Sequence, residues 1–222
     1  MIGIIDYGMG NLRSVLKAIE FLGGEGRVTA RAEELDACEK LILPGVGSCG
    51  AGMENLRRGG LDEYVRRRAA EGTPLLGICL GMQFLLEESE EEGLFQGLGL
   101  VKGRVVPFTE GKIPHMGWNA VEDMRGPLFD GIPSGTQFYF VHSYFADTAE
   151  EYTLGKTEYY RTFASAGGKN NVFGVQFHPE KSGAAGLQLL GAVLMVVNQA
   201  LLNGDHHFFF HLAAQFHSHQ GS

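Results

Sequence analysis

Cys79 lies between two glycines, in the segment Gly77-Ile78-Cys79-Leu80-Gly81 that ends the apolar run PLLGIC. G-x-C-x-G is the pattern of a nucleophile elbow, a sharp strand-to-helix turn that holds its central residue in a strained conformation permitted only by small neighbours. The turn directs the first N–H groups of the following helix at the cysteine, which favours a thiolate and any oxyanion beside it. The pattern predicts a nucleophilic Cys79, and a buried structural cysteine between two packing glycines is the alternative.

The segment FGVQFHPE, residues 173–180, supplies a histidine and a carboxylate two residues apart. Val175 and Phe177 alternate with Gly174 and Gln176, which predicts a half-buried strand that stops at Pro179. His178 can take the thiol proton while Glu180 fixes its tautomer and stabilises the imidazolium. An ordinary loop histidine is the alternative. The carboxyl edge of one sheet is where open α/β folds place their sites, and both segments can lie there.

Residues 45–50, GVGSCG, match the pattern G-x-G-x-x-G after the apolar run KLIL. One interpretation is a dinucleotide fingerprint. However, Pro44 precedes it, and Asp62 and Glu63 lie in a helical pattern, whereas the fingerprint needs an acid at the end of the next strand. We favour a glycine-rich turn whose N–H groups face Cys79 as part of an oxyanion hole.

Strands and helices alternate in the first half of the chain. The pattern predicts strands at 2–5, 40–43 and 74–79, with helical segments at about 12–22, 53–65 and 80–85. Asn11 is a candidate N-cap, and Gly59-Gly60 a candidate break in the second helical segment. This alternation predicts an α/β fold with an open, mostly parallel sheet covered by helices on both faces.

Short runs rich in Val and aromatic residues follow from about Leu98. LGLVKGRVVPF, QFYFVHSYF and NNVFGVQF indicate strands of an antiparallel or mixed extension, and residues 186–202 return to an apolar helix.

Composition limits the class of protein. The 222 residues are 44% hydrophobic, which suits one α/β domain, and the net charge of −8 argues against a nucleic-acid partner. Three cysteines without CxxC spacing favour a reducing compartment over a disulfide framework or zinc site. No apolar run reaches the roughly 18–20 residues that cross a bilayer, and no signal segment follows Met1. We therefore expect a soluble cytoplasmic protein without metal or cofactor.

The chain resembles the class I (triad) glutamine amidotransferases, whose signatures GxCxGxQ and HPE stand here at 77–83 and 178–180. Within that superfamily it is similar to the glutaminase subunits of imidazole glycerol phosphate synthase. The narrower resemblance rests on six motifs: IIDYGMGNL (4–12), LPGVG (43–47), GICLGMQ (77–83), PHMGWN (114–119), YFVHSY (139–144) and GVQFHPEKSG (174–183). It implies a flavodoxin-like amidotransferase domain over residues 1–202.

The resemblance implies a role for each residue of the site. Cys79 would attack the amide carbon of glutamine, His178 would act as base and then acid, and Glu180 would orient His178. The resulting thioester would be hydrolysed to glutamate. Oxyanion donors would come from Leu80, Val46 and Gly47. The resemblance also implies that a peptide of the 45–47 turn must flip before its N–H can donate. Family positions for glutamine binding map onto Gly45, Gln83, His142, Ser143 and Tyr144.

The resemblance also implies a partner. Ammonia would pass to a separate (β/α)8-barrel cyclase subunit that makes imidazole glycerol phosphate and an aminoimidazole carboxamide ribotide. Family interface positions map onto Asn11, Trp118, Tyr139 and Lys181. Three alternatives stay open: the glutaminase of another amidotransferase, a dinucleotide-binding protein using 45–50, and a catalytically idle partner that kept the fold.

Two segments depart from the family pattern. Ser48-Cys49 follows LPGVG where an aromatic is common at the second position, so a second thiol is expected near the site. Residues 203–222 form a separate tail that holds five of the eight histidines. A metal-binding segment is one interpretation of the tail, and an extension without function is the one we favour.

Overall fold

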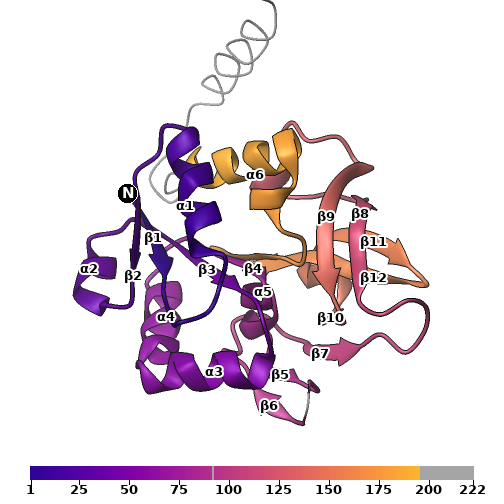
Figure 1. Ribbon diagram of the computed structural model, residues 1–222, viewed down its shortest axis with the longest axis horizontal. Helices are drawn as coiled ribbons and strands as arrows, with labels where there is room; N and C mark the ends of the chain where they lie inside the picture. The colour runs from indigo at the N-terminus through magenta and orange to yellow at the C-terminus, as the bar shows by residue number, and fades with distance from the viewer. Residues whose placement is uncertain (92, 196–222) are drawn as a thin grey trace, which may run out of the picture.

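The computed structural model of the chain describes residues 1–91 and 93–195 (Figure 1). The His- and Phe-rich tail 203–222, and residues 196–202 of the predicted last helix, lie outside the described residues. The predicted domain boundary at 202 therefore stays a prediction.

Short apolar runs build the parallel half of the sheet. Its strands are β1 (Ile2–Ile5), β2 (Gly26–Thr29), β3 (Lys40–Gly45), β4 (Leu75–Cys79) and β13 (Val172–Val175). They lie in the order β2-β1-β3-β4-β13 and every neighbouring pair is parallel. β1, β3 and β4 are buried at every position, as expected for strands covered on both faces. The order matches a flavodoxin-like sheet, which confirms the predicted fold class.

An antiparallel and mixed extension continues the sheet beyond β13. It contains β12 (Arg161–Lys169), β10 (Tyr144–Asp147), β7 (Arg104–Pro107), β5 (Glu88–Ser89), β6 (Phe95–Gln96) and β11 (Thr153–Tyr159), which pairs with β12. A separate hairpin joins β8 (His115–Val121) to β9 (Thr136–His142). The run QFYFVHSYF, predicted as one strand, is divided at Ser143 between β9 and β10.

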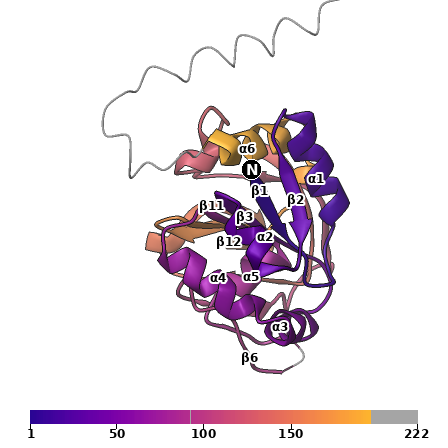
Figure 2. The same ribbon diagram turned by 90° about the vertical axis from the view of Figure 1, so that its left-hand side faces the viewer.

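Helices cover the two faces of the parallel strands (Figures 1 and 2). One face carries α1 (Leu12–Phe21) and α6 (Gly183–Met195); the other carries α2 (Ala32–Asp36), α3 (Cys49–Arg58), α4 (Leu61–Ala70) and α5 (Leu80–Leu85). The buried side chains divide in the same way: Ile19 and Leu189 belong to one apolar cluster, and Leu56 and Phe84 to the other. Among the helices described, none combines the length and apolar character needed to cross a membrane.

The predicted break at Gly59-Gly60 is confirmed. α3 ends at Arg58 and α4 begins at Leu61, while Gly60 adopts a φ of 66° that suits glycine.

Asn11 precedes α1, as predicted, but its side chain does not cap the helix. Its Nδ2 donates a hydrogen bond to Glu180 Oε1 at 3.1 Å, and its Oδ1 accepts one from Ser14 Oγ at 2.8 Å. The capping prediction is therefore wrong for the side chain, because the amide is held by a carboxylate 169 residues along the chain.

Candidate active site

Cys79 occupies a strained turn between β4 and α5. It is a non-glycine residue with φ 54° and ψ −110°, a conformation that costs on the order of 1–3 kcal/mol. The flanking glycines make the turn possible. A Cβ on Gly77 would lie 2.5 Å from the Gly81 carbonyl oxygen, and one on Gly81 would lie 1.8 Å from the Leu43 carbonyl oxygen. The predicted elbow geometry is confirmed.

His178 and Glu180 lie just beyond β13, the strand that pairs with β4. The His178 N–H donates to the Tyr139 carbonyl at 2.9 Å, and Ser182 Oγ donates to the His178 carbonyl at 2.6 Å. These bonds fix the turn η3 (Pro179–Lys181) against β9. Within it, His178 Nδ1 lies 2.9 Å from Glu180 Oε1, and both side chains are at most 2% exposed.

The neighbours of His178 favour its charged form. Burial alone would lower its pKa, but the nearby Cys79 thiol and the hydrogen bond to Glu180 outweigh burial and raise the pKa from 6.5 to about 9. Burial likewise opposes ionisation of Glu180, yet His178 and Asn11 hold the pKa of that carboxyl below its usual range. The second ring nitrogen, Nε2, is buried and has no hydrogen-bond partner among the described residues. Nε2 therefore remains available to the nearby Cys79 sulfur.

The Cys79 side chain is 7% exposed and meets two polar groups. Its Sγ lies 3.9 Å from the Val141 carbonyl oxygen and 3.8 Å from Gln176 Nε2. A sulfur at these distances can donate to a carbonyl and accept from an amide N–H. The thiol thus faces polar groups rather than packed hydrocarbon alone.

The glycine-rich turn after β3 emerges beside the elbow, because Gly45 pairs directly with Cys79 across the parallel strands. Val46 is 39% exposed, and Gly47 has a φ of 99° that favours glycine. The dinucleotide alternative lacks its acid, since Asp62 belongs to α4 and pairs with Arg66 instead of ending a strand. The position of the turn supports the oxyanion interpretation.

Comparison with known proteins agrees with this geometry. The family model described as glutamine amidotransferase class-I matches residues 4–192. The chain belongs to the class-I glutamine amidotransferase family. It is 53% identical over 192 residues to the imidazole glycerol phosphate synthase subunit HisH of Methanocaldococcus jannaschii, covering 86% of this chain and 96% of that protein. The HisH subunit of Geobacillus thermodenitrificans is 51% identical, with 89% and 96% covered.

Solved structures show the same fold at lower identity. A glutamine amidotransferase crystal structure aligns with a TM-score of 0.70 and 22% identity, covering 86% of this chain and 98% of the other. The PurLQS structure from Thermotoga maritima aligns with a TM-score of 0.71 and 21% identity, covering 87% and 97%.

The residues predicted to bind glutamine in this amidotransferase lie around Cys79. Gln83 is buried one turn into α5, and its Nε2 donates to the Tyr144 carbonyl at 3.0 Å. His142 Nδ1 bonds the same carbonyl at 2.8 Å, while its Nε2 lies 2.9 Å from His115 Nδ1. Because both ring nitrogens are engaged within the protein, the predicted role of His142 in glutamine binding would have to use its backbone. Ser143 is half-buried between the two strands.

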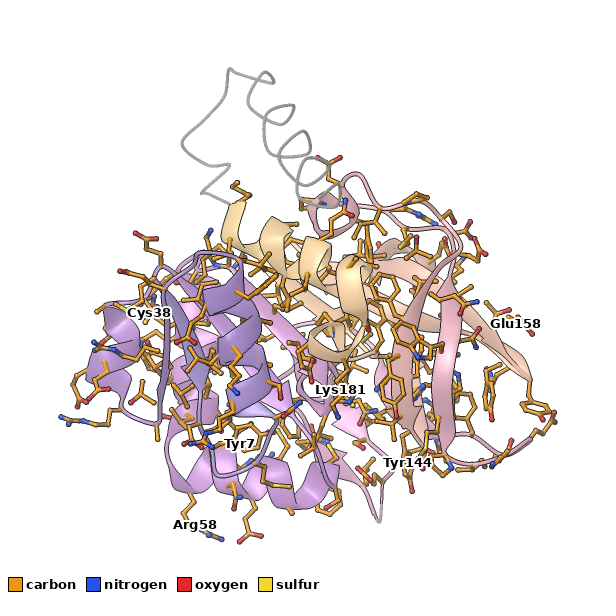
Figure 3. All side chains as sticks on the ribbon, turned by 45° about the horizontal axis from the view of Figure 1, so that its top comes forward. Tyr7, Cys38, Arg58, Tyr144, Glu158 and Lys181 are labelled. Carbon is orange, nitrogen blue, oxygen red and sulfur yellow. The ribbon has the colours of Figure 1, made fainter. Side chains whose placement is uncertain are left out.

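The predicted interface residues fall into two groups. Trp118 is 54% exposed and lies opposite Tyr139 on the β8–β9 hairpin, with ring centroids 6.2 Å apart. Lys181 is exposed on the η3 turn, and Figure 3 shows it next to the start of α6. Asn11 differs, because its side chain bonds the site carboxylate Glu180. An interface at these residues would border the η3 turn directly.

Sequence reasoning missed Gln176 and Tyr7 as residues of the site. Gln176 is fully buried against Cys79, and the Tyr7 hydroxyl is buried without a hydrogen-bond partner among the described residues. Burial, followed by the charges of Cys79 and Cys49, raises the pKa of Tyr7 well above its usual range. Both residues stand within the quoted motifs, and a polar side chain inside an apolar run was the available signal.

The His178–Glu180 pair predicts a pH dependence of stability. A pKa that rises from 6.5 to about 9 on folding gives a stabilising contribution that is complete below pH 6.5 and is lost as the pH rises through 9. We expect the free energy of unfolding to fall by on the order of 2 kcal/mol across this window, measured by urea denaturation. The Glu180→Gln variant should show a clearly smaller fall. An identical pH profile for the two proteins would contradict the assignment of this coupling to Glu180.

Proposed function

We propose that this chain is the glutaminase subunit of an imidazole glycerol phosphate synthase, active in the cytoplasm with a separate cyclase subunit. The single observation that carries the proposal is the placement of Cys79 on its elbow beside the buried His178–Glu180 pair. The chain shares about half of its aligned residues with HisH subunits over nearly their whole length, which supports the choice of this synthase within the family.

The proposed reaction uses these groups in sequence. His178 takes the proton of the Cys79 thiol, and the sulfur attacks the side-chain amide carbon of glutamine. The carbonyl oxygen becomes an oxyanion held by the N–H of Leu80 and one from Val46 or Gly47. His178 gives a proton to the amide nitrogen, which leaves as ammonia while a thioester forms on Cys79. Water, deprotonated by His178, then hydrolyses the thioester to glutamate and restores the thiol.

Glu180 acts through His178 in this scheme. Its Oε1 accepts from Nδ1, which fixes the ring with Nε2 toward the sulfur and stabilises the imidazolium. Asn11 donates to the same oxygen and limits the movement of the carboxylate. Gly45, Gln83, Ser143 and Tyr144 would hold the glutamine itself.

The proposed partner is a (β/α)8-barrel cyclase that consumes the ammonia. A heterodimer would use the exposed Trp118 and Tyr139 on the hairpin and Lys181 on the η3 turn. Direct transfer matters because ammonia released to water near neutral pH becomes ammonium, which is not a nucleophile. Ammonia formed at Cys79 would therefore have to leave on the face that the cyclase covers.

The test is glutamate release by the chain alone, with a cyclase subunit, and with the cyclase and its nucleotide ligand. We expect slow release alone and an increase of at least about tenfold when both are present. Formation of imidazole glycerol phosphate from glutamine in the same mixture would identify the synthase. Equal glutamate release under all three conditions would argue for the glutaminase of another amidotransferase. Absence of glutamate release under all three would refute the proposal that the chain is a glutaminase.

A further inference from the structure

Gln176 is a buried polar residue whose side-chain amide faces the Cys79 sulfur. It directly follows β13, is completely buried, and its backbone N–H donates to the Ser165 carbonyl at 2.8 Å. Its side chain bridges two residues. Oε1 accepts from Gln83 Nε2 at 3.0 Å, and Nε2 lies 3.8 Å from Cys79 Sγ.

The orientation of the Gln176 amide follows from its neighbours. The Tyr144 carbonyl can only accept hydrogen bonds, so the Gln83 atom that faces it at 3.0 Å is the amide nitrogen. The same nitrogen faces Gln176, which must present its oxygen there. The Gln176 N–H group is therefore left pointing at Cys79.

Two histidines make this arrangement rigid. Burial lowers the pKa of His142 to about 3 despite its bond to the Tyr144 carbonyl, and burial lowers the pKa of His115 to about 4. Both rings are neutral near pH 7, so each carries one proton. His142 Nδ1–H donates to Tyr144, His115 Nδ1–H donates to His142 Nε2, and Asn119 Nδ2 lies 3.2 Å from His115 Nε2. Each hydrogen bond in this network has a single possible donor. The network therefore fixes the Tyr144 carbonyl and the side-chain amides of Gln83 and Gln176.

Besides His178, two polar groups face the sulfur, and they favour opposite protonation states of Cys79. The Val141 carbonyl, 3.9 Å from Sγ, can accept from the neutral thiol but repels a thiolate. The Gln176 N–H, 3.8 Å away, makes a stronger bond to the thiolate than to the thiol. We propose that Gln176 is a catalytic residue of this site, whose fixed amide N–H stabilises and aims the Cys79 thiolate. The proposal rests on the assignment of Cys79 as the nucleophile.

Alkylation of Cys79 by iodoacetamide tests the contact without glutamine or the cyclase. The rate is measured on the full-length chain from pH 5 to 10, with the modified cysteine identified by mass spectrometry. Gln176→Met keeps the length of the side chain and removes the N–H. We expect alkylation at pH 7 to slow by about tenfold to a hundredfold, the range for hydrogen bonds to charged groups, and the midpoint of the pH profile to rise.

Gln176→Glu provides a second variant with nearly unchanged shape. One carboxylate oxygen can still accept from Gln83, while the other faces the sulfur in place of the N–H. We expect a larger loss than in Gln176→Met, because a like charge replaces a donor. Gln188→Met is the matched control, since Gln188 is exposed on α6 and its amide lies 3.4 Å from the Asp130 carbonyl. Its alkylation profile should equal that of the unmodified protein.

The outcomes separate the proposal from simple destabilisation and from the proposed function. Unchanged rate and midpoint in a folded Gln176→Met or Gln176→Glu variant would overturn it. A slower rate that only follows loss of the cooperative melting transition would also count against it. If the unmodified protein shows the expected alkylation but never forms glutamate, the proposed function fails while the contact is still measured.

Discussion

Replacement of Cys79 by alanine is expected to abolish glutamate production, with a loss of at least about ten-thousandfold. No other thiol can take its place. Cys79 alone stands at the elbow opposite His178, and Cys49 is 1% exposed with its backbone N–H held by Glu91. Glutamate release in the presence of the cyclase is the measurement.

Cys38→Ala is the matched control for this experiment. Cys38 is also buried, but its Sγ faces the Glu34 carbonyl at 3.6 Å, and Figure 3 shows it near the edge of the molecule away from Lys181. Its glutamate production should be unchanged. A complex carrying Cys79→Ala should still assemble and use ammonium salts in place of glutamine. Substantial glutamate formation by Cys79→Ala would remove the cysteine from the mechanism.

Replacement of Gly81 by alanine is expected to unfold or severely destabilise the protein, by about 3 kcal/mol or more. The added methyl group would lie 1.8 Å from the Leu43 carbonyl oxygen, an atom fixed in the centre of the sheet. The conflict can be relieved only by moving α5 away from β3, which displaces the elbow as well. Urea denaturation measures the loss.

Gly191→Ala provides the opposite result at a matched site. Gly191 also lies within a helix, α6, and a Cβ there meets nothing within 4 Å. Alanine should stabilise this variant by about 0.5–1 kcal/mol, because glycine is the poorer helix former. Equal stability of the two variants would show that close packing at Gly81 is not what selects glycine.

The sequence predicted the parallel strands well because burial and pattern agree there. β1, β3 and β4 are short, mostly apolar segments that are buried at every position, and a glycine lies at the end of β3 or within three residues beyond the end of β1 and β4. β2, with the sequence GRVT, and β12, with several small residues, carry no such pattern. Their conformation depends on hydrogen-bonded neighbours far along the chain, which local composition does not encode.

The site was predicted in part for the same reason. Cys79 lies between the two glycines of an elbow pattern, and Glu180 follows His178 by two residues. Sequence reasoning could therefore name all three as candidate catalytic residues. Gln176 was placed on the exposed side of a half-buried strand, but β13 is covered on both faces and the amide is fully buried. The role proposed for Gln176 depends on the atom that its amide faces, and only the three-dimensional structure shows that this atom is the Cys79 sulfur.

Neighbouring positions of β4 and β13 in the sheet affect when the enzyme could become competent during its synthesis. His178 leaves the ribosome 99 residues after Cys79, a delay of roughly 5–20 s at typical translation speeds. Until β13 is inserted, the nascent polypeptide presents the Cys79 sulfur without its proposed base. If His178 is that base, we expect unfinished chains to leave cellular glutamine intact.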